Sequence, residues 1–155
     1  MTNITSVYLS GGMEYAEDEG RDWRQTMHTW LTENVKCHVF NPNVESDKFF
    51  ARAFPGVDVR LLKKTDIVKY ASIVSQLVEL DCKEIAERSD LVICYWDDSA
   101  MRGAGTKGEL TIAKHFGKPV YMVTTMPILD IPGWVLGCTT LMFSSFDELK
   151  KFLLM

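Results

Sequence analysis

The chain has 155 residues, 46% of them hydrophobic, and a formal net charge of −4. This length accommodates one domain with a sizeable core but not two, so we predict a single domain over residues 1–155. The net negative charge and the scattered lysines and arginines offer no basic stripe, and we therefore expect no nucleic acid polymer as a partner.

Cysteine and hydropathy patterns exclude further classes. The three histidines show no metal-ligand spacing with the cysteines, which form no CxxC pair and are Cys37, Cys82, Cys94 and Cys138. We expect reduced, mostly buried thiols and no metal or other cofactor. The N-terminal residues lack a basic start followed by a long apolar core, and no stretch approaches the roughly 18 apolar residues of a membrane span. We therefore expect a cytoplasmic protein with no membrane partner.

Short hydrophobic runs and amphipathic periodicities alternate along the chain. A strand is predicted at 7–10, ended by two glycines. A helix is predicted over about 17–34, with one face formed by Trp23, Met27, Trp30 and Leu31. A second strand is predicted at 37–40. Segment 41–70 is expected to be irregular but folded over the core, because Pro42 interrupts it early and three phenylalanines make it an unusual linker.

The second half continues the alternation. We predict a helix over 73–88, a strand at 91–96, a helix from Thr106 to Phe116, strands at 120–123 and 139–143, and a closing helix at about 146–154. Strands that alternate with helices indicate a single-domain Rossmann-like or flavodoxin-like α/β fold. This is a doubly wound, mostly parallel five-stranded sheet with helices on both faces. Ligands of such sheets bind outside the carboxyl ends of the strands.

The first predicted strand opens into GGMEYAEDE, residues 11–19. A Gly-Gly turn permits positive φ values and a close approach of the backbone to a ligand. The acids that follow would repel a phosphate but would complement the dipole of a helix that starts here. Two interpretations stay open: a well-capped helix after a tight turn, or a binding loop whose acids meet the hydroxyl groups of a ligand such as a sugar.

Asp81 is the second candidate for a functional residue. It follows Val74, Leu77 and Val78 at helical spacings that place it on or beside their hydrophobic stripe. A lone carboxylate there costs several kcal/mol of desolvation unless it is paired. Either Asp81 lies at the edge of the stripe and bonds to solvent or backbone, or it faces a site. In a site, burial would raise its pKa and suit it to proton exchange or to a hydrogen bond with a substrate.

The stretch WDDSAMRGAGTKGEL, residues 96–110, is the third candidate. Asp97 and Asp98 follow a predicted strand, a flexible turn ends at Gly105, and Thr106 starts a helix with Glu109 in its first turn. Thr106 and Glu109 have the spacing of a capping box, in which a hydroxyl and a carboxylate satisfy free backbone amides. The same position also lets a helix N-terminus stabilise an ionised carboxylate, which can act as a nucleophile above the sheet.

Three motifs in this order resemble the nucleoside 2-deoxyribosyltransferase family, including its nucleotide N-hydrolase relatives. They are Tyr8-Leu9-Ser10-Gly11-Gly12-Met13 after the first strand, Asp81-x3-Ile85 ahead of Ser89-Asp90, and Gly105-Thr106-x2-Glu109-x3-Ala113 followed by Gly117-Lys118-Pro119-Val120. The resemblance extends over the whole chain.

The resemblance implies cleavage of the N-glycosidic bond of a nucleoside by a double displacement. Glu109 would attack the anomeric carbon, and a second base or water would then take the sugar with net retention. Tyr8 would hold Glu109 by hydrogen bonding, and Asp81 would help to position the substrate. The other residues expected to line the site are Ser10, Gly11, Gly12, Met13, Asp97, Asp98, Gly105 and Thr106.

The sequence departs from the family pattern at several positions. Many transferases carry an aspartate that contacts the base six residues before the nucleophile; Gly103 occupies that position here, and Asp97 or Asp98 could substitute for it. The transferases also use an asparagine near the C-terminus to complete a neighbouring subunit's site, and FDELKKFLLM has none. The opening loop has acids where the nucleotide hydrolases hold a 5′-phosphate, so we favour a free nucleoside or a similar glycoside.

Two other functions stay open. The glycine at position 103 motivates a nucleoside or nucleotide sensor that uses the same cleft without turnover. The apolar stretch from Met126 to Cys138, with Trp134, could be core or the interface of an assembly module. The family resemblance also implies a homo-oligomer, a dimer or higher. The expected partners are a small-molecule nucleoside or nucleobase and further copies of the chain.

Overall fold

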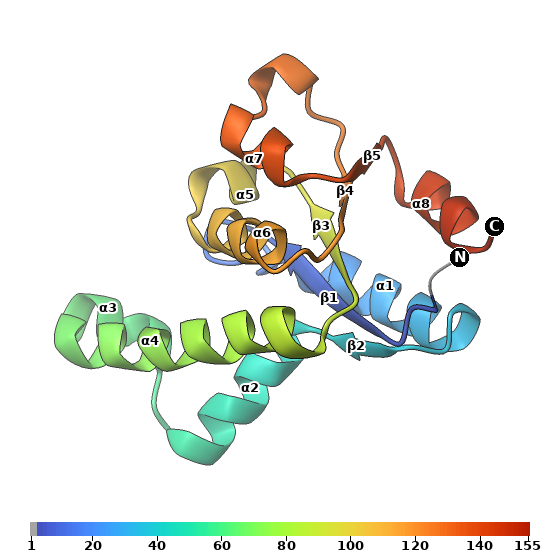
Figure 1. Cartoon of the computed structure of the whole chain (residues 1–155). Coiled ribbons are helices and arrows are strands. Elements are labelled where there is room, and N and C mark those ends of the chain that lie inside the picture. Colours follow the sequence, from blue (N-terminus) through green and yellow to red (C-terminus); the bar gives the residue numbers. More distant parts are fainter. Residues whose placement is uncertain (1–2) are drawn as a thin grey trace.

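The computed structural model describes residues 3–155, so the first two residues of the predicted domain lie outside the described range. Within that range, parallel strands form one five-stranded sheet in the order β2-β1-β3-β4-β5 (Figure 1). The strands are β1 (Ser6–Gly11), β2 (His38–Phe40), β3 (Leu91–Tyr95), β4 (Val120–Val123) and β5 (Leu141–Phe143). The predicted doubly wound α/β fold is confirmed, and every strand pairing is parallel.

Helices connect the strands and cover both faces of the sheet. They are α1 (Arg21–Asn34), α2 (Pro42–Ala53), α3 (Val59–Thr65), α4 (Ile67–Lys83), α5 (Asp98–Arg102), α6 (Gly105–His115), α7 (Gly133–Cys138) and α8 (Phe146–Leu153), with the short turns η1 (Glu84–Arg88) and η2 (Ile128–Asp130). Residues of α1 and α8 pack on one face, and residues of α6, α7 and η1 pack on the other (Figure 1). None of the helices in residues 3–155 has the length and hydropathy to span a membrane.

Side chains of β1 alternate between the two hydrophobic clusters that lie on opposite faces of the sheet. Successive side chains of a strand point to opposite faces, so residues two positions apart share a face. Val7 and Leu9 pack in the core cluster that includes residues of α1 and α8. Tyr8 packs in the other cluster, with Leu110 of α6. The polar residue Ser10 is fully buried on the same side as Tyr8, which marks this side of β1 as more than a hydrophobic surface.

The expectation of an irregular segment over 41–70 is wrong, because α2, α3 and the start of α4 occupy it. Each helix begins with a side-chain cap. Asn41 accepts a hydrogen bond from the Asn43 amide, Asp58 from the Leu61 amide, and Asp66 from the Lys69 amide. Pro42 follows the first cap at a position where its missing N–H costs nothing, so it starts a helix rather than only ending a strand.

The strand order creates a crevice beside β1. The chain passes from β1 to β2 on one side and then crosses to β3 on the other side of β1. Loops leave such a switch point in opposite directions and open a space at the carboxyl ends of the two adjacent strands. β1 ends at Gly11 and β3 ends at Tyr95, and these two residues are paired in the sheet. The residues that follow them therefore border the same edge.

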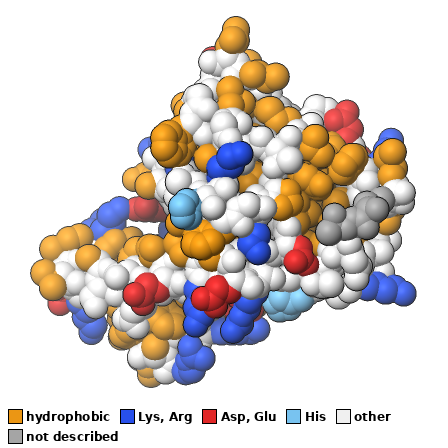
Figure 2. Space-filling model, in the orientation of Figure 1, with side chains coloured by type: hydrophobic (Ala, Val, Ile, Leu, Met, Phe, Trp, Pro, Cys, Tyr) orange, Lys and Arg blue, Asp and Glu red, His pale blue; other side chains and the backbone are white. Residues whose placement is uncertain are grey.

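Two groups of exposed hydrophobic side chains are close together in the sequence. One is formed by α3 and α4, where Figure 2 shows hydrophobic atoms at the surface; it includes Leu61, Ile67, Val68 and Val78. The other is part of the stretch from Met126 to Cys138, which the structure divides. Ile131, Val135 and Cys138 belong to the core, whereas the exposed residues are Ile128, Leu129 and Trp134. Self-association of the chain stays a prediction, which light scattering can test.

Candidate active site

Glu109 of α6 is held by two hydroxyl groups of β1. The Tyr8 hydroxyl donates a hydrogen bond to Oε2 of Glu109, and Ser10 Oγ donates to Oε1 at 2.8 Å. Both donors are fully buried, whereas Glu109 itself is only half-buried. The two donors share a face of β1 because they are two positions apart. Protein groups therefore orient the carboxylate without enclosing the whole residue.

Helix α6 does not use Glu109 as a cap. The helix begins at Gly105, its N-cap residue is Ala104, and no side chain accepts a hydrogen bond from its first turn. Glu109 is the fifth residue of the helix, so it lies in the second turn. The predicted capping box is therefore wrong: Thr106 is buried and Glu109 bonds to β1 instead. Gly105 is exposed.

Asp81 of α4 lines a cavity next to Glu109. It shares that lining with Val74 and Leu77, at helical spacings of seven and four residues. Burial raises the pKa of Asp81 to about 8, and the charge of Glu109 adds to this effect, while the charge of Arg24 and the neighbouring Tyr8 hydroxyl oppose it. Asp81 is therefore a carboxyl group that keeps its proton near neutral pH.

Asp81 and Glu109 titrate as a pair. Burial also raises the pKa of Glu109, whereas the hydrogen bonds from Tyr8 and Ser10 and the charge of Arg24 lower it. Burial and both carboxylates raise the pKa of Tyr8 well above its ordinary value, so its hydroxyl stays a donor. Since Glu109 has two hydroxyl donors, it is the better position for the negative charge. We therefore expect Glu109 ionised and Asp81 protonated.

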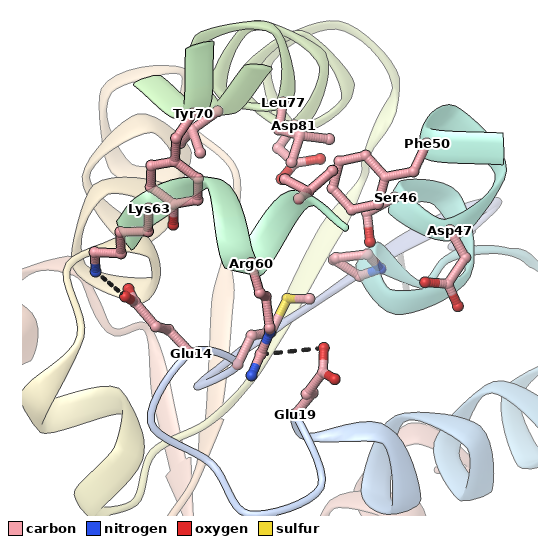
Figure 3. Close-up of a pocket in the computed structure, with 14 residues that line it drawn as sticks. Glu14, Glu19, Ser46, Asp47, Phe50, Arg60, Lys63, Tyr70, Leu77 and Asp81 are labelled. Atoms are coloured by element: carbon pink, nitrogen blue, oxygen red, sulfur yellow. Dashed lines mark hydrogen bonds and ion pairs between the residues drawn. The ribbon is translucent and has the colours of Figure 1, made fainter. Parts of the chain in front are cut away.

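The cavity beside Asp81 has a volume of about 340 Å³ and lies under α3 and α4. Its walls come from the loop after β1 and from α2, α3 and α4; they are Met13, Glu14, Glu19, Pro42, Ser46, Asp47, Phe50, Val59, Arg60, Lys63, Tyr70, Val74, Leu77 and Asp81. The rings of Phe50 and Tyr70 lie on either side of Leu77 and Asp81 (Figure 3). An apolar wall with a few polar groups is typical of a small-molecule site. Glu109 is not part of this wall, but the Tyr8 hydroxyl that donates to Glu109 also influences the pKa of Asp81.

Ion pairs join α3 to the loop after β1 at the cavity. Lys63 pairs with Glu14, and Arg60 Nη2 lies 3.2 Å from Glu19 Oε2 (Figure 3). All four side chains are at least one-third exposed. Pairs of this kind contribute only about 0–1 kcal/mol each, because water and salt screen them. They hold α3 over the cavity but leave the cations able to exchange partners.

The acids of the loop after β1 have two different roles. Asp18 caps α1: its Oδ1 accepts from the Gly20 amide at 2.9 Å and its Oδ2 from the Asp22 amide at 2.9 Å. The hydrogen bond from Asp22 is the main cause of the lowered pKa of Asp18. Glu14 and Glu19 reach the cavity instead. Asp18 therefore satisfies amides at the start of α1, whereas contact of Glu14 and Glu19 with a ligand stays a prediction.

Gly11 and Gly12 are required by packing within the protein. Both are buried, and neither lines the cavity. A Cβ at Gly12 would overlap the side chain of Ser99, and a Cβ at Gly11 would lie 2.8 Å from Trp23 Cζ2. The positive φ values of this loop occur later, at Glu19 (62°) and Gly20 (71°). The close approach predicted for the Gly-Gly turn is thus made to α5 and α1.

Asp97 and Asp98 border a different hollow, of about 430 Å³, together with Trp96 and Met126. Asp97 is the N-cap of α5 and accepts a hydrogen bond from the Ala100 amide at 3.0 Å. Asp98 is exposed. The structure does not bring these two acids to the cavity of Asp81, and their contact with a substrate stays a prediction.

The thiols are not arranged for chemistry. All four cysteines are free, and three of them are buried. Burial raises the pKa of Cys37, Cys82 and Cys94, which disfavours the reactive thiolate. Among the described residues, no group of three or more His, Cys, Asp or Glu side chains is placed to hold a metal ion.

Sequence reasoning missed five residues around the site: Arg24, Phe50, Arg60, Lys63 and Tyr70. The last four lie in or beside segment 41–70, whose helices were not predicted. Arg24 gave a readable signal, because it precedes Met27 by three positions and Leu31 by seven, and these three residues are the buried face of α1. The predicted face included Trp23 and Trp30, which are only half-buried.

Comparisons with known proteins support the fold. No protein-family model matches the sequence, and no curated protein sequence is similar to it. Among solved structures, the chain is similar to the Clostridium botulinum CMP N-glycosidase BcmB, with a TM-score of 0.56 and 17% sequence identity. The similarity covers 96% of this chain and 97% of that one. At this identity the likeness establishes a shared α/β fold over the whole length.

Proposed function

We propose that this protein cleaves the N-glycosidic bond of a nucleoside, with Glu109 as the nucleophile. The observation that carries the proposal is the Glu109 carboxylate, held by the hydroxyls of Tyr8 and Ser10 beside a cavity that Asp81 lines. The order of the three sequence motifs supports it, and so does the fold that the chain shares with a CMP N-glycosidase.

The first step forms a covalent glycosyl-enzyme. An oxygen of Glu109 bonds to the anomeric carbon while the bond from that carbon to the base nitrogen breaks. The electron pair of the broken bond passes to the base, and Asp81 donates its proton to the base. Glu109 is then a glycosyl ester and Asp81 a carboxylate. The acids of the cavity stabilise the positive charge that develops on the sugar ring.

The second step reverses these roles. Water or a second base attacks the anomeric carbon, and the ester bond to Glu109 breaks, which restores its carboxylate. Asp81 takes the proton that the attacking group loses. Two displacements at one carbon give net retention. Hydrolysis and base transfer therefore share every protein group and differ only in the attacking molecule.

The charges around the cavity favour a free nucleoside over a nucleoside monophosphate. The apolar wall with Phe50 and Tyr70 suits a base, since aromatic rings stack on its flat face. With Asp81 protonated, three carboxylates (Glu14, Glu19 and Asp47) and two cations (Arg60 and Lys63) line the cavity, which leaves a net charge of −1. Both cations are already paired with glutamates. A phosphate would have to displace those partners.

Base release tests the proposal directly. The protein is incubated with ribonucleosides, deoxynucleosides and their 5′-monophosphates, with and without an acceptor base, and the free base is followed by chromatography. We expect release by the wild type and loss of release in Glu109→Gln. Mass spectrometry of the quenched reaction should find the sugar on the peptide that contains Glu109. The matched control is Glu79→Gln, an exposed position on α4. No release from any substrate, or equal release by Glu109→Gln, would overturn the proposal.

A second candidate is a nucleoside sensor that uses the same cavity without turnover. Two observations favour it. Gly103 has no carboxylate, and Asp97 and Asp98 line a separate hollow, so neither position supplies an acid besides Asp81 to assist the leaving base. A sensor would be stabilised thermally by a nucleoside and would release no base over a long incubation. Saturable turnover would exclude it.

A further inference from the structure

Arg24 of α1 is a fully enclosed cation. The residue is 1% exposed. Five backbone carbonyls and one side-chain amide oxygen lie within hydrogen-bond distance of its guanidinium, and four of these acceptors share the two N–H groups of Nη1. The shortest bond runs from Nη2 to Gly11 O at 2.7 Å. The other acceptors, at 3.3 to 3.5 Å, are the carbonyls of Leu9, Gly12, Glu19 and Gly20 and Oδ1 of Asn43.

No direct ion pair neutralises this charge. None of the ion pairs within residues 3–155 includes Arg24, although the opening loop around it is rich in carboxylates. Burying a cation among neutral acceptors is costly unless its hydrogen bonds are complete and charges farther away compensate. Burial accordingly lowers the pKa of Arg24, and the carboxylate of Glu109 is the leading influence that raises it.

The acceptors of Arg24 belong to three separate parts of the site. Leu9, Gly11 and Gly12 form the end of β1 and the turn after it, and Glu19 and Gly20 form the turn before α1. Asn43 is at the start of α2 and also donates from Nδ2 to Glu19 O at 3.0 Å. One guanidinium thus connects the strand that carries Tyr8 and Ser10 to the loop that carries Glu19 into the cavity.

Glu109 is surrounded by groups that act on its charge. Tyr8 of β1 donates a hydrogen bond to it, its charge acts on Cys94 of β3 and on Asp81 and Cys82 of α4, and Glu84 acts on Asp81. None of these groups is positively charged. Arg24 is the cation that acts on both Glu109 and Asp81, and it lowers the pKa of each against the larger effect of burial.

We propose that Arg24 is a positioning residue of this site: its guanidinium fixes the loop after β1, and its positive charge stabilises the carboxylate form of Glu109. The catalytic meaning of this role rests on the proposed function. The electrostatic role does not, since Glu109 has a measurable ionisation whether or not a substrate turns over.

The test measures the pKa of Glu109 by carbon NMR. Protein with ¹³C-labelled glutamate carboxyl groups is titrated, and the Glu109 signal is assigned by its loss in Glu109→Gln. Asn43→Asp places a carboxylate beside the guanidinium and cancels its charge without removing it. Asn43→Ala is the control, which removes the side-chain contacts of Asn43 and adds no charge. We expect Asn43→Asp to raise the pKa of Glu109 by about one pH unit. Asn43→Ala should leave it unchanged.

Substitution of Arg24 separates its two roles. Arg24→Lys keeps the charge and loses most of the carbonyl contacts, so we expect a higher KM and an unmoved pKa of Glu109. Arg24→Met loses the charge and the carbonyl contacts, and it should raise the pKa of Glu109. If Arg24→Met does not fold, the Asn43 pair decides alone. An unchanged pKa in Asn43→Asp, or equal pKa values in folded Arg24→Met and Arg24→Lys, would overturn the inference. A raised pKa in a protein that releases no base would leave the role of Arg24 intact and remove the proposed function.

Discussion

The carboxylate of Glu109 accepts a hydrogen bond from the hydroxyl of Tyr8, although 101 positions separate the two residues in the chain. Tyr8 is in β1, which pairs with β3, and α6 follows β3 after the short helix α5. The sheet therefore brings the donor and the acceptor together. The raised pKa of Tyr8 keeps its hydroxyl protonated, so that it can donate this bond. Glu109 accepts the bond as a carboxylate, which is the form that can act as a nucleophile.

Tyr8→Phe should weaken catalysis while keeping the core. The ring stays in place, stacked on Phe40 at 5.2 Å, and only the donor is lost. A hydrogen bond to a charged group contributes about 1.5–3 kcal/mol, so we expect kcat/KM to fall about 10- to 100-fold. The low-pH side of the rate profile should move to higher pH, because Glu109 loses a group that lowers its pKa. Steady-state kinetics across pH measure both effects. Tyr121→Phe, elsewhere in the sheet, is the control. An unmoved profile with unchanged kcat/KM contradicts the role of Tyr8.

Asp81 should set the high-pH side of the rate profile. Its pKa of about 8 means that it loses the proton needed by the leaving base as the pH rises through that value. We expect kcat/KM to decline above about pH 8 in the wild type. Asp81→Asn should be slower throughout and lack this decline. A nucleoside with a cationic base, such as a 7-methylated purine, needs no proton to depart and should restore much of the rate. Persistence of the decline in Asp81→Asn would assign it to another group.

The same group should make stability depend on pH. The pKa of Asp81 is about 8 in the folded protein against an ordinary value of 3.8. Between these values the folded state holds a proton that the unfolded state has released, so the free energy of unfolding falls as the pH rises. Asp81→Asn removes this term. Urea denaturation at several pH values should show the variant gaining stability relative to the wild type from about pH 4 to pH 8. Parallel pH slopes for the two proteins would contradict the raised pKa.

Gly20→Ala should destabilise the fold more than Gly56→Ala. Both glycines have positive φ, 71° and 73°. A Cβ at Gly20 would also overlap Gly12 O and the guanidinium of Arg24, whereas nothing lies within 4 Å of one at Gly56. Backbone strain alone costs about 1 kcal/mol, which we expect for Gly56→Ala, and the overlap should add about 1–3 kcal/mol at Gly20. Thermal or urea denaturation gives both values. Equal losses would show that the loop adjusts freely around Arg24.

Glu19→Gln should change the preference between a nucleoside and its 5′-monophosphate. The substitution removes the partner of Arg60 at the cavity and leaves that cation free for a phosphate. Exposed ion pairs contribute about 0.2–1 kcal/mol, so the affinity for the monophosphate should rise by up to about fivefold. The affinity for the free nucleoside should stay the same. Calorimetry in a Glu109→Gln background avoids turnover. Equal changes for both ligands would mean that Arg60 does not meet the phosphate.

The sheet could be predicted from the sequence because its strands are short, apolar and bounded by turn residues. Leu91–Tyr95 and Val120–Val123 are buried almost throughout, which is typical of parallel strands covered on both faces. Tyr8, Asp81 and Glu109 could be named because each breaks a local pattern or belongs to an ordered motif. Their mutual contact could not be derived from the sequence alone, since it depends on which strands are neighbours.

Helix α3, which lies over the cavity, could not be predicted because its helix signals are local and polar. Helix α3 has seven residues and no buried side chain, so it leaves no hydrophobic stripe in the sequence. The predicted capping box had the correct residue types, but tertiary contacts with β1 determined where the Glu109 side chain points. Asp97 is a second case of this kind. Its place after a predicted strand indicated a site residue, but in the structure its side chain caps α5 and does not line the cavity of Asp81.

The alternation of β1 ties the chemistry of this protein to its folding. Tyr8 and Ser10 point toward α6 only because Val7 and Leu9 point toward α1 and α8. An inserted or deleted residue early in this strand would turn both hydroxyls into the opposite layer and bring two aliphatic side chains against Glu109. A shift of this strand by one residue would therefore remove the core packing of β1 and the two hydroxyl donors of Glu109 together.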